Sequence, residues 1–475
     1  LVQFEPRLSS TAASADEWVP IQPGTEGQVA LGLGKILVEE GLAGDLPDPQ
    51  LYEQVNLAEV TAASGVPAEE LERLARIFAS VSSAVAVPGG AVTGQRNGAA
   101  ALSAVYTLNH LANQLGQPGG VYLSAPPAGP DLTAAPLSSY ADVRDLIDDM
   151  ASGRVQVLLV HGANPVFELP AAQGFAEALA NVPFVVSFSS TVDETAVQAD
   201  LILPDHTSLE GWGYYAPALA DRTVVSSQQP IMRPLHDTRA TVDVLLALAR
   251  ELGGQVAQAL PWPNEVEFVQ QTLETLNDGS MPAEAFWAEW RRRGGYWSET
   301  EEMGSPAASG GFAGPLSLAE PGSEADAGVY PYHLYPYPSI ALFDGRGANK
   351  SWLQETPDPM TTVTWQTWIE IHPNTAEALG VQADDIVRVI SPVGEVEAIV
   401  YVYPGISEEV VAMPIGRGHE DYGRFARDRG TNPVRLLVPE ADQETGALAW
   451  QATRVRIEPT GQQKTRARLE RPAGV

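Results

Sequence analysis

The sequence predicts an α/β protein in which parallel, nucleotide-fold-like sheet domains are followed by a small C-terminal β-barrel. Between residues 83 and 203, short β-branched runs alternate with helical stretches, which is typical of a parallel sheet. After residue 330 the chain consists mostly of short strands separated by tight Gly and Pro turns, and this pattern favours a small barrel. The length of 475 residues also exceeds one ordinary domain of roughly 100 to 200 residues, so we expect several domains.

Changes in composition along the chain predict successive regions. The tract 300–335 is rich in Gly, Ser and Pro and lacks the periodicity of a helix or strand. It is either a linker or a surface arm that lies along a neighbouring subunit. The expected regions are an N-terminal segment with a helix (1–60), an α/β domain (61–299), the linker (300–335), a β-barrel domain (336–460) and a tail (461–475).

Three segments have the apolar periodicity of amphipathic helices. Residues 29–40 place their apolar side chains on one face. Residues 67–79 begin with a proline and carry acidic residues at the positive end of the helix dipole. Residues 241–252 form the third such segment.

The α/β region is expected to contain strands that end in Gly or Pro turns and lead into helices. The expected strands are 84–90, 155–165, 184–187 and 200–204, and the expected helices are 99–115, 171–180 and a short one beginning near Asp193. In the barrel, the expected strands are 368–372, 385–390, 395–403 and 409–413, with one helical turn at 373–380.

Composition excludes several classes of partner. With 60 acidic against 28 basic residues, the net charge of −32 would repel a phosphate backbone, so nucleic acid is not an expected partner. No apolar run reaches the roughly 18 residues that would indicate a membrane-spanning helix.

Leu1 is not followed by a basic and then apolar leader, which indicates a processed chain or an internal segment.

The absence of cysteine removes much of redox chemistry. Iron–sulfur clusters are normally held by thiolates, and so are many structural zinc ions. The seven histidines form no HxH or HxxxH pair, so no metal site is expected. No GxSxG elbow is present and no carboxylate pair is indicated by spacing, so no catalytic residue is predicted. Any redox function must therefore use a partner or an organic cofactor.

The best candidates for contact with a ligand lie where the parallel strands end, because such sheets bind nucleotides beyond their carboxyl edge. Gly89, Gly90, Gly162, Asn164 and Pro165 occupy these positions. Glycine lets the backbone approach a phosphate closely, but it equally makes a tight turn from strand to helix. Spacing alone leaves both interpretations open.

Two further segments carry polar groups. Asp193 or Thr191 can cap a helix, whereas Asp200, at a strand start, is better placed to meet a polar ligand. His419 lies in a Gly-rich loop, PIGRGHEDYGR (414–424), whose arginines, histidine and tyrosine suit an anion or a planar ring. The same side chains would also serve to tie the barrel to the α/β domain.

Taken in order, these segments resemble the dimethyl sulfoxide reductase superfamily of molybdopterin oxidoreductases. ADEWVPIQPGT (15–25), VLLVHGANP (157–165), DETAVQADLILPDHTSLEGWG (193–213) and IEIHPNTAEALGVQADDIVRVISPVGEVEA (369–398) are similar to successive motifs of that family. In its catalytic members a pterin dinucleotide lies between two nucleotide-fold domains and the C-terminal barrel, and the metal ligand and cluster cysteines belong to an N-terminal half that precedes this region. The residues that the resemblance places toward a nucleotide are Gly162, Asn164, Glu194, Thr195, Asp200 and Pro204 from the α/β side, and Gly416, His419 and Asn432 from the barrel side.

Three other segments resemble one branch of this superfamily more closely. LFDGRGANKSWLQETPDPMT (342–361), the segment 401–433 and YPYHLYPYPS (330–339) are similar to the large iron–sulfur subunit of alternative complex III. That subunit joins a molybdopterin-like domain without cofactor to a separate cluster-binding domain. The missing cysteines fit a chain that represents only the first of these parts.

This resemblance implies a non-catalytic, cofactor-free scaffold in a membrane quinol:electron-acceptor oxidoreductase of a respiratory or photosynthetic chain. The implied partners are an iron–sulfur cluster-binding domain or subunit, a multihaem cytochrome c subunit and quinol-binding integral membrane subunits, on the periplasmic face. One alternative is the C-terminal part of a catalytic polysulfide or thiosulfate-type reductase that binds molybdopterin guanine dinucleotide. Another is a soluble nucleotide-binding protein, which recovery as a free monomer would favour.

Overall fold

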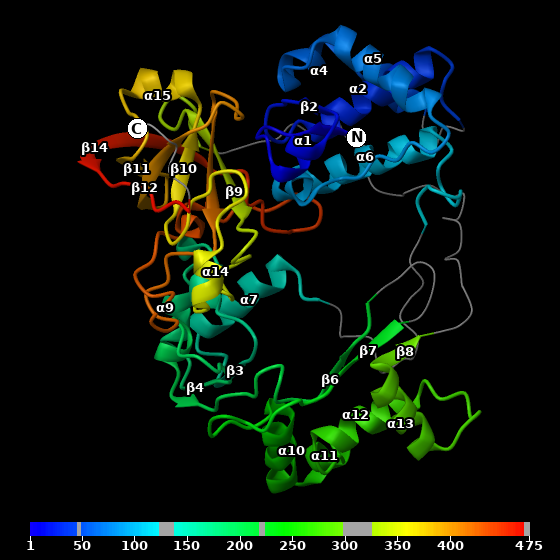
Figure 1. Cartoon of the computed structure of the whole chain (residues 1–475), viewed down its shortest axis with the longest axis vertical. Coiled ribbons are helices and arrows are strands. Elements are labelled where there is room, and N and C mark those ends of the chain that lie inside the picture. Colours follow the sequence, from blue (N-terminus) through cyan, green and yellow to red (C-terminus); the bar gives the residue numbers. More distant parts are fainter. Residues whose placement is uncertain (45–48, 123–136, 218–223, 298–324, 470–475) are drawn as a thin grey trace.

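The described residues form four groups of secondary structure that follow one another along the chain (Figure 1). The computed structural model describes residues 1–44, 49–122, 137–217, 224–297 and 325–469. An N-terminal helical unit is followed by a parallel sheet, a second helical unit with an antiparallel sheet, and a six-stranded C-terminal sheet. Within those ranges, no helix is both long enough and apolar enough to cross a bilayer.

The N-terminal unit is built around α2, against which α4, α5 and α6 pack. Their apolar faces share one core that includes Leu31, Leu37 and Leu71. The helices expected at 29–40, 67–79 and 99–115 are confirmed as α2, α5 and α6. The elements of this unit are β1 (Val2–Phe4), α1 (Ser10–Ser14), β2 (Glu17–Val19), α2 (Glu26–Glu39), α3 (Pro49–Gln54), α4 (Leu57–Ser64), α5 (Ala68–Ser80), η1 (Gly90–Gly94) and α6 (Gly98–Leu111).

The close approach of α2 and α6 makes Gly27 sensitive to any added side chain. A Cβ atom at Gly27 would lie 2.7 Å from the Cα atom of Ala101. We expect Gly27→Ala to lower the free energy of unfolding by about 1 to 3 kcal/mol, because the two helices must move apart. A urea titration followed by circular dichroism measures this change. Gly89→Ala is the matched control, since nothing lies within 4 Å of a Cβ atom there. Equal losses in both variants would contradict the packing argument.

The parallel sheet has three strands in the order β3-β4-β5. Val160 pairs with Ser187 and Ser187 pairs with Ile202, so the carboxyl ends of the three strands are in register. One face packs on α7 and α9 through an apolar core. The strands expected over 155–165, 184–187 and 200–204 are confirmed, whereas the helix expected near Asp193 is a single 3-10 turn. The elements are α7 (Tyr140–Ala151), β3 (Val157–Val160), α8 (Pro165–Glu168), η2 (Ala171–Gln173), α9 (Phe175–Leu179), β4 (Phe184–Ser187), η3 (Ala196–Gln198) and β5 (Leu201–Ile202).

The strand expected over 84–90 is wrong. Residues 84–89 have no regular secondary structure, and among the described residues no strand pairs with them. Instead, the side-chain amide of Asn109 on α6 accepts from the N–H of Ala86 at 2.7 Å and donates to its C=O at 2.8 Å. A β-branched run favours an extended backbone, but a sheet also needs a neighbouring strand. The parallel sheet therefore begins only at β3.

The second helical unit carries an antiparallel sheet that the sequence analysis did not anticipate. The strands follow the order β6-β7-β8, and Val225 packs with Leu273 and Trp290 beneath them. The helix expected over 241–252 is confirmed as α10. The elements are β6 (Gly213–Tyr215), β7 (Val224–Gln228), α10 (Thr241–Leu252), α11 (Gly254–Ala259), α12 (Glu265–Glu274), α13 (Ala283–Arg293) and β8 (Gly295–Trp297).

The C-terminal sheet has six strands in the order β10-β12-β11-β14-β9-β13, and it closes on itself because β13 also pairs with β10. Its interior is filled by apolar side chains such as Ile369, Val400 and Met413, all fully buried. The strands expected at 368–372, 385–390, 395–403 and 409–413 are confirmed. The elements are β9 (Tyr332–Pro338), α14 (Ser351–Glu355), β10 (Trp368–Ile371), α15 (Pro373–Leu379), β11 (Asp385–Ile390), β12 (Glu395–Val402), β13 (Val410–Ile415), η4 (Pro433–Leu436) and β14 (Arg454–Gln463).

Two strands of this sheet escaped the sequence analysis. β9 contains Pro336 and Pro338, and β14 contains Pro459 and Gly461, which are residues rare in central strands. β9 also takes up the end of the tract that we expected to be a linker over 300–335. The first part of that tract, up to residue 324, and residues 470–475 of the expected tail lie outside the described residues.

A buried ion pair attaches the N-terminal segment to the C-terminal sheet, and Figure 1 shows these two parts of the chain next to each other. Arg7 Nη2 donates to Glu370 Oε1 at 2.8 Å, and Arg7 Nε donates to Glu370 Oε2 at 2.5 Å. Tyr337 and Trp368 also donate to this carboxylate, whose residue is 0% exposed. Burial, reinforced by the charge of Glu370, raises the pKa of Tyr337 well above its ordinary value, so the phenol remains a donor.

Candidate functional site

The candidate site lies where the parallel sheet meets a loop of the C-terminal sheet. Asn164 follows β3, and Glu194 and Thr195 follow β4, so the carboxyl ends of adjacent strands bring these side chains together. The loop that follows β13 brings His419 against them. All four residues are buried, with at most 8% of their surface exposed.

Asn164, Glu194 and Thr195 are linked by hydrogen bonds within the parallel sheet unit. Asn164 Nδ2 donates to Glu194 Oε2 at 2.6 Å. Asn164 Oδ1 accepts from both the backbone N–H and the hydroxyl of Thr195, at 3.1 and 2.7 Å. The Thr195 hydroxyl in turn accepts from the N–H of Val166 at 3.2 Å. These side chains therefore satisfy one another's hydrogen-bonding groups and do not face open solvent.

The Glu194 carboxylate also binds the Gly-rich loop of the C-terminal sheet. His419 Nδ1 lies 3.1 Å from Glu194 Oε1 and 3.2 Å from Oε2. The backbone N–H groups of Glu420 and Asp421 donate to Oε1 at 2.9 and 3.2 Å. Successive backbone N–H groups of this kind are the donors with which loops bind anions. In this structure the anion that they hold is the protein's own carboxylate.

Aromatic stacking fixes the ring of His419. It stacks on Phe167 with centroids 3.7 Å apart and on Tyr422 with centroids 4.9 Å apart. A Cβ atom at Gly345 would lie 2.8 Å from His419 Nε2, which is buried and has no hydrogen-bond partner among the described residues. Asn432 completes the contact by donating to the carbonyl of Phe167 at 2.9 Å. The space around the ring is thus occupied on both faces.

Electrostatics favour the ionised form of Glu194. Burial alone would raise the pKa of this carboxyl, but hydrogen bonds from His419 and Asn164 outweigh it and lower the pKa to about 2. The carboxylate is therefore negative throughout the neutral range. A second anion placed beside it would meet repulsion in a poorly solvated environment.

Four of the nine predicted residues do not join this cluster. Gly162 is exposed, with φ +68° and no atom within 4 Å of a Cβ, and Pro204 makes a backbone contact to Arg239. Asp200 accepts from the N–H of Val185 at 2.8 Å, which ties β5 to β4. Gly416, with φ +106°, permits a close approach, since a Cβ there would lie 3.1 Å from Leu342 Cβ.

The other early candidates have local structural roles. Gly89 and Gly90 lie at the start of η1 in the N-terminal unit, because no strand forms before them. Asp193 caps η3, accepting from the backbone N–H groups of Thr195 and Ala196 at 3.1 and 2.8 Å. Pro165 is the first residue of α8.

A second buried polar group, between the N-terminal unit and the C-terminal sheet, was not predicted. Gln451 donates its backbone N–H to Gly94 O at 2.7 Å, next to Gln95. Side-chain atoms of Glu26, Gln95 and Gln451 are buried without a hydrogen-bond partner among the described residues. Burial raises the pKa of Glu26 to about 7. The polar residues at 95–97 are the sequence signal that could have indicated this group.

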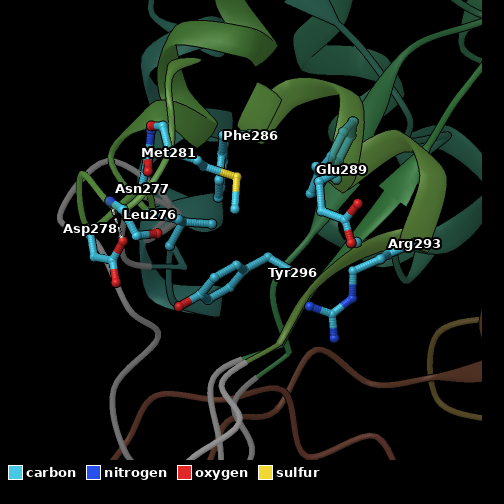
Figure 2. A pocket seen from close by; sticks show the side chains of 11 residues that line it. Leu276, Asn277, Asp278, Met281, Phe286, Glu289, Arg293 and Tyr296 are labelled. Atoms are coloured by element: carbon cyan, nitrogen blue, oxygen red, sulfur yellow. Dashed lines mark hydrogen bonds between the residues drawn. The ribbon is translucent and has the colours of Figure 1, made fainter. Parts of the chain in front are cut away.

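A separate pocket, of about 120 Å³, lies in the second helical unit and shares no residue with either polar group (Figure 2). Leu276, Met281 and Phe286 point into it beside Tyr296. No group of three or more His, Asp or Glu side chains in the described part of the chain has the arrangement of a metal site.

Two family models match the chain. The model described as Molybdopterin oxidoreductase matches residues 1–251, and the model described as Molydopterin dinucleotide binding domain matches residues 345–453. Glu194 lies in the first match and His419 in the second. The candidate site is therefore a contact between the two matched regions.

Individual relatives agree with these matches. The chain is 29% identical over 473 residues to the menaquinone reductase, molybdopterin-binding-like subunit, of Nitratidesulfovibrio vulgaris, covering 95% of this chain and 64% of that protein. It is 22% identical to the arsenate respiratory reductase molybdopterin-containing subunit of Shewanella sp. (strain ANA-3), covering 96% and 70%. The chain thus spans just under two thirds of the length of the first of these relatives.

A solved structure shares the fold. Acetylene hydratase from Pelobacter acetylenicus superposes with a TM-score of 0.74 at 18% identity, covering 96% of this chain and 73% of that one. This likeness confirms the predicted combination of parallel sheets with a C-terminal domain of strands.

Proposed function

Because this chain belongs to the molybdopterin oxidoreductase family, we propose that it is a non-catalytic, cofactor-free scaffold within a membrane quinol:electron-acceptor oxidoreductase of the alternative complex III type. In this role the chain holds electron-carrying subunits in place and contributes no active site. A protein can keep the fold of its family after the active site has been lost, because the fold depends on the core and the chemistry depends on a few side chains.

The observation that carries the proposal is the position of the Glu194 carboxylate. The residues that the family resemblance places toward a nucleotide from both sides, Asn164, Thr195 and His419, contact this carboxylate or one another instead. Two backbone N–H groups of the Gly-rich loop also donate to it. A pyrophosphate at the same loop would need those donors and would lie beside a buried negative charge. This arrangement therefore supports a chain that binds no anionic dinucleotide at this loop.

One of the named relatives supports a link to quinones. The relative from Nitratidesulfovibrio vulgaris is called a menaquinone reductase subunit, and its name describes it as molybdopterin-binding-like. By analogy, we assign this chain to an assembly that exchanges electrons with a quinol pool. The proposed partners are an iron–sulfur cluster-binding domain or subunit, a multihaem cytochrome c subunit and integral membrane subunits that bind quinol. Iron–sulfur clusters and haem c belong to these partners, and we place the assembly on the periplasmic face of the membrane.

Affinity purification from native membranes tests the scaffold role. With a tag on this chain, we expect haem c absorbance, iron and quinol oxidation activity to co-purify with it in constant ratio. Recovery of the chain as a free monomer from the soluble fraction, without haem or cluster proteins, would contradict the proposal and favour a soluble nucleotide-binding protein.

One set of observations favours a second candidate, the dinucleotide-binding C-terminal part of a catalytic reductase. The match over residues 345–453 is to a dinucleotide-binding domain. Polar side-chain atoms of Glu26, Gln95 and Gln451 have no hydrogen-bond partner among the described residues, and a polar ligand such as molybdopterin guanine dinucleotide would supply one. Stoichiometric molybdenum or tungsten in the purified assembly distinguishes this candidate from the scaffold.

A further inference from the structure

A groove of about 470 Å³ lies between the N-terminal segment and the C-terminal sheet. Trp18 and Pro20 line it from β2 and the residue that follows this strand. Pro404 and Ile406 line it from the turn between β12 and β13. Pro20 and Pro404 are exposed, so the rim of the groove is open to solvent. Its volume lies in the range of ligand pockets, roughly 300 to 1,000 Å³.

Residues 5–8 of the chain hold the two lining segments together. Leu8 donates its backbone N–H to the carbonyl of Gly405 at 2.7 Å. The indole N–H of Trp18 donates to the carbonyl of Glu5 at 2.9 Å. Because both segments are already fixed, binding of a partner does not have to order them. The groove is therefore preformed.

The charge of the groove is negative. Glu408 and Glu409 line it, and both residues are exposed. Among the described residues that line it, none is Lys or Arg. His372 accepts the backbone N–H of Asn374 at its Nδ1, at 3.2 Å, so the ring is neutral and its proton lies on Nε2. The groove thus combines an apolar lining with two carboxylates.

The groups that surround the two carboxylates do not cancel their charge. Glu408 Oε1 accepts from Asn374 Nδ2 at 2.6 Å, and this donor is neutral. Arg454 interacts electrostatically with Glu409, but its guanidinium donates to two backbone carbonyl groups and does not line the groove. Both carboxylates therefore remain able to pair with a cation from outside.

The groove lies at the opposite end of β13 from the candidate site. The turn at 404–407 precedes this strand, and the loop that carries His419 follows it. The 6 residues of β13 span about 20 Å at roughly 3.3 Å per residue. Binding in the groove is therefore independent of the contacts between Glu194 and His419.

We propose that this groove binds an extended segment of a partner protein, in which a lysine or arginine lies next to apolar residues. The cation pairs with Glu408 and Glu409, and its aliphatic stem packs on Trp18. Pro20 and Pro404 have no backbone N–H, so the segment binds through its side chains and not as an added strand. Extended segments dock in this way in preformed grooves with an aromatic lining.

A protein segment fits this groove better than a small cation. Solvent screens carboxylates as exposed as these, so an isolated cation gains little from them. A segment that also buries apolar side chains gains from both interactions. The inference rests on the proposed function to the extent that a scaffold needs surfaces for its partners, and it names the chemistry that one such surface recognises.

Photo-cross-linking in the native assembly tests this inference. We place p-benzoylphenylalanine at Pro404 in one variant and at Pro20 in another, two exposed positions in the two lining segments. Both should cross-link to the same basic segment of one partner protein. Adding Glu408→Gln together with Glu409→Gln should lower the cross-link yield about three- to tenfold, the effect of losing two exposed ion pairs.

Glu395→Gln together with Glu397→Gln is the matched control, because it removes the same charge from exposed positions toward the far end of β12. It should leave the yield unchanged. An unchanged yield without the carboxylates of Glu408 and Glu409 would overturn the inference. So would cross-links confined to lipid or to residues 1–475, or no cross-link at either position, as a small bound cation would give.

Failure of this inference and failure of the proposed function are separate results. Haem, iron and quinol oxidation that co-purify with the chain, but without a cross-link from the groove, would refute the docking segment alone. A cross-link to a basic segment in an assembly that carries no haem or iron would refute the scaffold role alone.

Discussion

Arg7→Met is expected to destabilise the C-terminal sheet by about 3 to 5 kcal/mol, because it leaves the buried Glu370 carboxylate without its counter-charge. Glu370 is 0% exposed and Arg7 is 5% exposed, so water cannot replace the lost guanidinium. Denaturant unfolding gives the free energy, and hydrogen exchange in β10 locates the loss. The double variant Arg7→Met with Glu370→Leu should recover much of it, since no isolated charge then remains.

Arg388→Met is the matched control for this prediction. Arg388 pairs with Glu458, but their side chains are 44% and 39% exposed, so solvent screens the pair. We expect little measurable change. If Arg7→Met were equally mild, the buried pair would not be the attachment of the N-terminal segment that we describe.

Glu194→Gln is expected to weaken the contact between the parallel sheet and the C-terminal loop. Its pKa is lowered from 4.5 to about 2, and at about 1.4 kcal/mol per pKa unit this corresponds to at most about 3 to 4 kcal/mol of stability at neutral pH. A carboxyl whose pKa is lowered on folding contributes stability above its unfolded pKa. The contribution is therefore full above pH 4.5 and is lost as the pH falls toward 2.

Acid titration of the wild type and Glu194→Gln measures this contribution. The two proteins should differ most at neutral pH and converge as the pH falls below 4.5. Glu420→Gln is the control, because its carboxylate pairs with Arg435 at the surface and takes no part in the buried network. A difference that persists unchanged at low pH would show that the carboxylate charge is not what holds the loop.

The sequence predicted those parts of the fold in which the apolar periodicity of a segment agrees with the elements that it packs against. α10 and β11 have the bounds that their patterns indicate, because each buries one regular face. The strand predicted over 84–90 was wrong because its valines favour an extended backbone, but no strand in the described part of the chain lies beside it. β9 and β14 were missed because prolines and glycine interrupt patterns that only the closed sheet makes favourable.

The candidate site, like the fold, could be predicted from the sequence only in part. Family motifs indicated Asn164, Glu194 and His419, and the structure brings them together across more than 200 residues of sequence. No spacing rule could reveal that the Glu194 carboxylate would accept hydrogen bonds from the backbone amides of the opposing loop. That contact depends on how two separate units pack. Asp200 is the opposite case. We expected it to meet a polar ligand, and it instead accepts a hydrogen bond from the neighbouring strand.

Metal and pterin analysis of the native assembly tests the central claim most directly. Molybdenum and tungsten are quantified against protein by mass spectrometry, and oxidised pterin released by acid is measured by fluorescence, with a catalytic family member as positive control. The scaffold account predicts only traces of all three. A stoichiometric amount of metal with its pterin would contradict it, and would make this chain the dinucleotide-binding part of a working reductase.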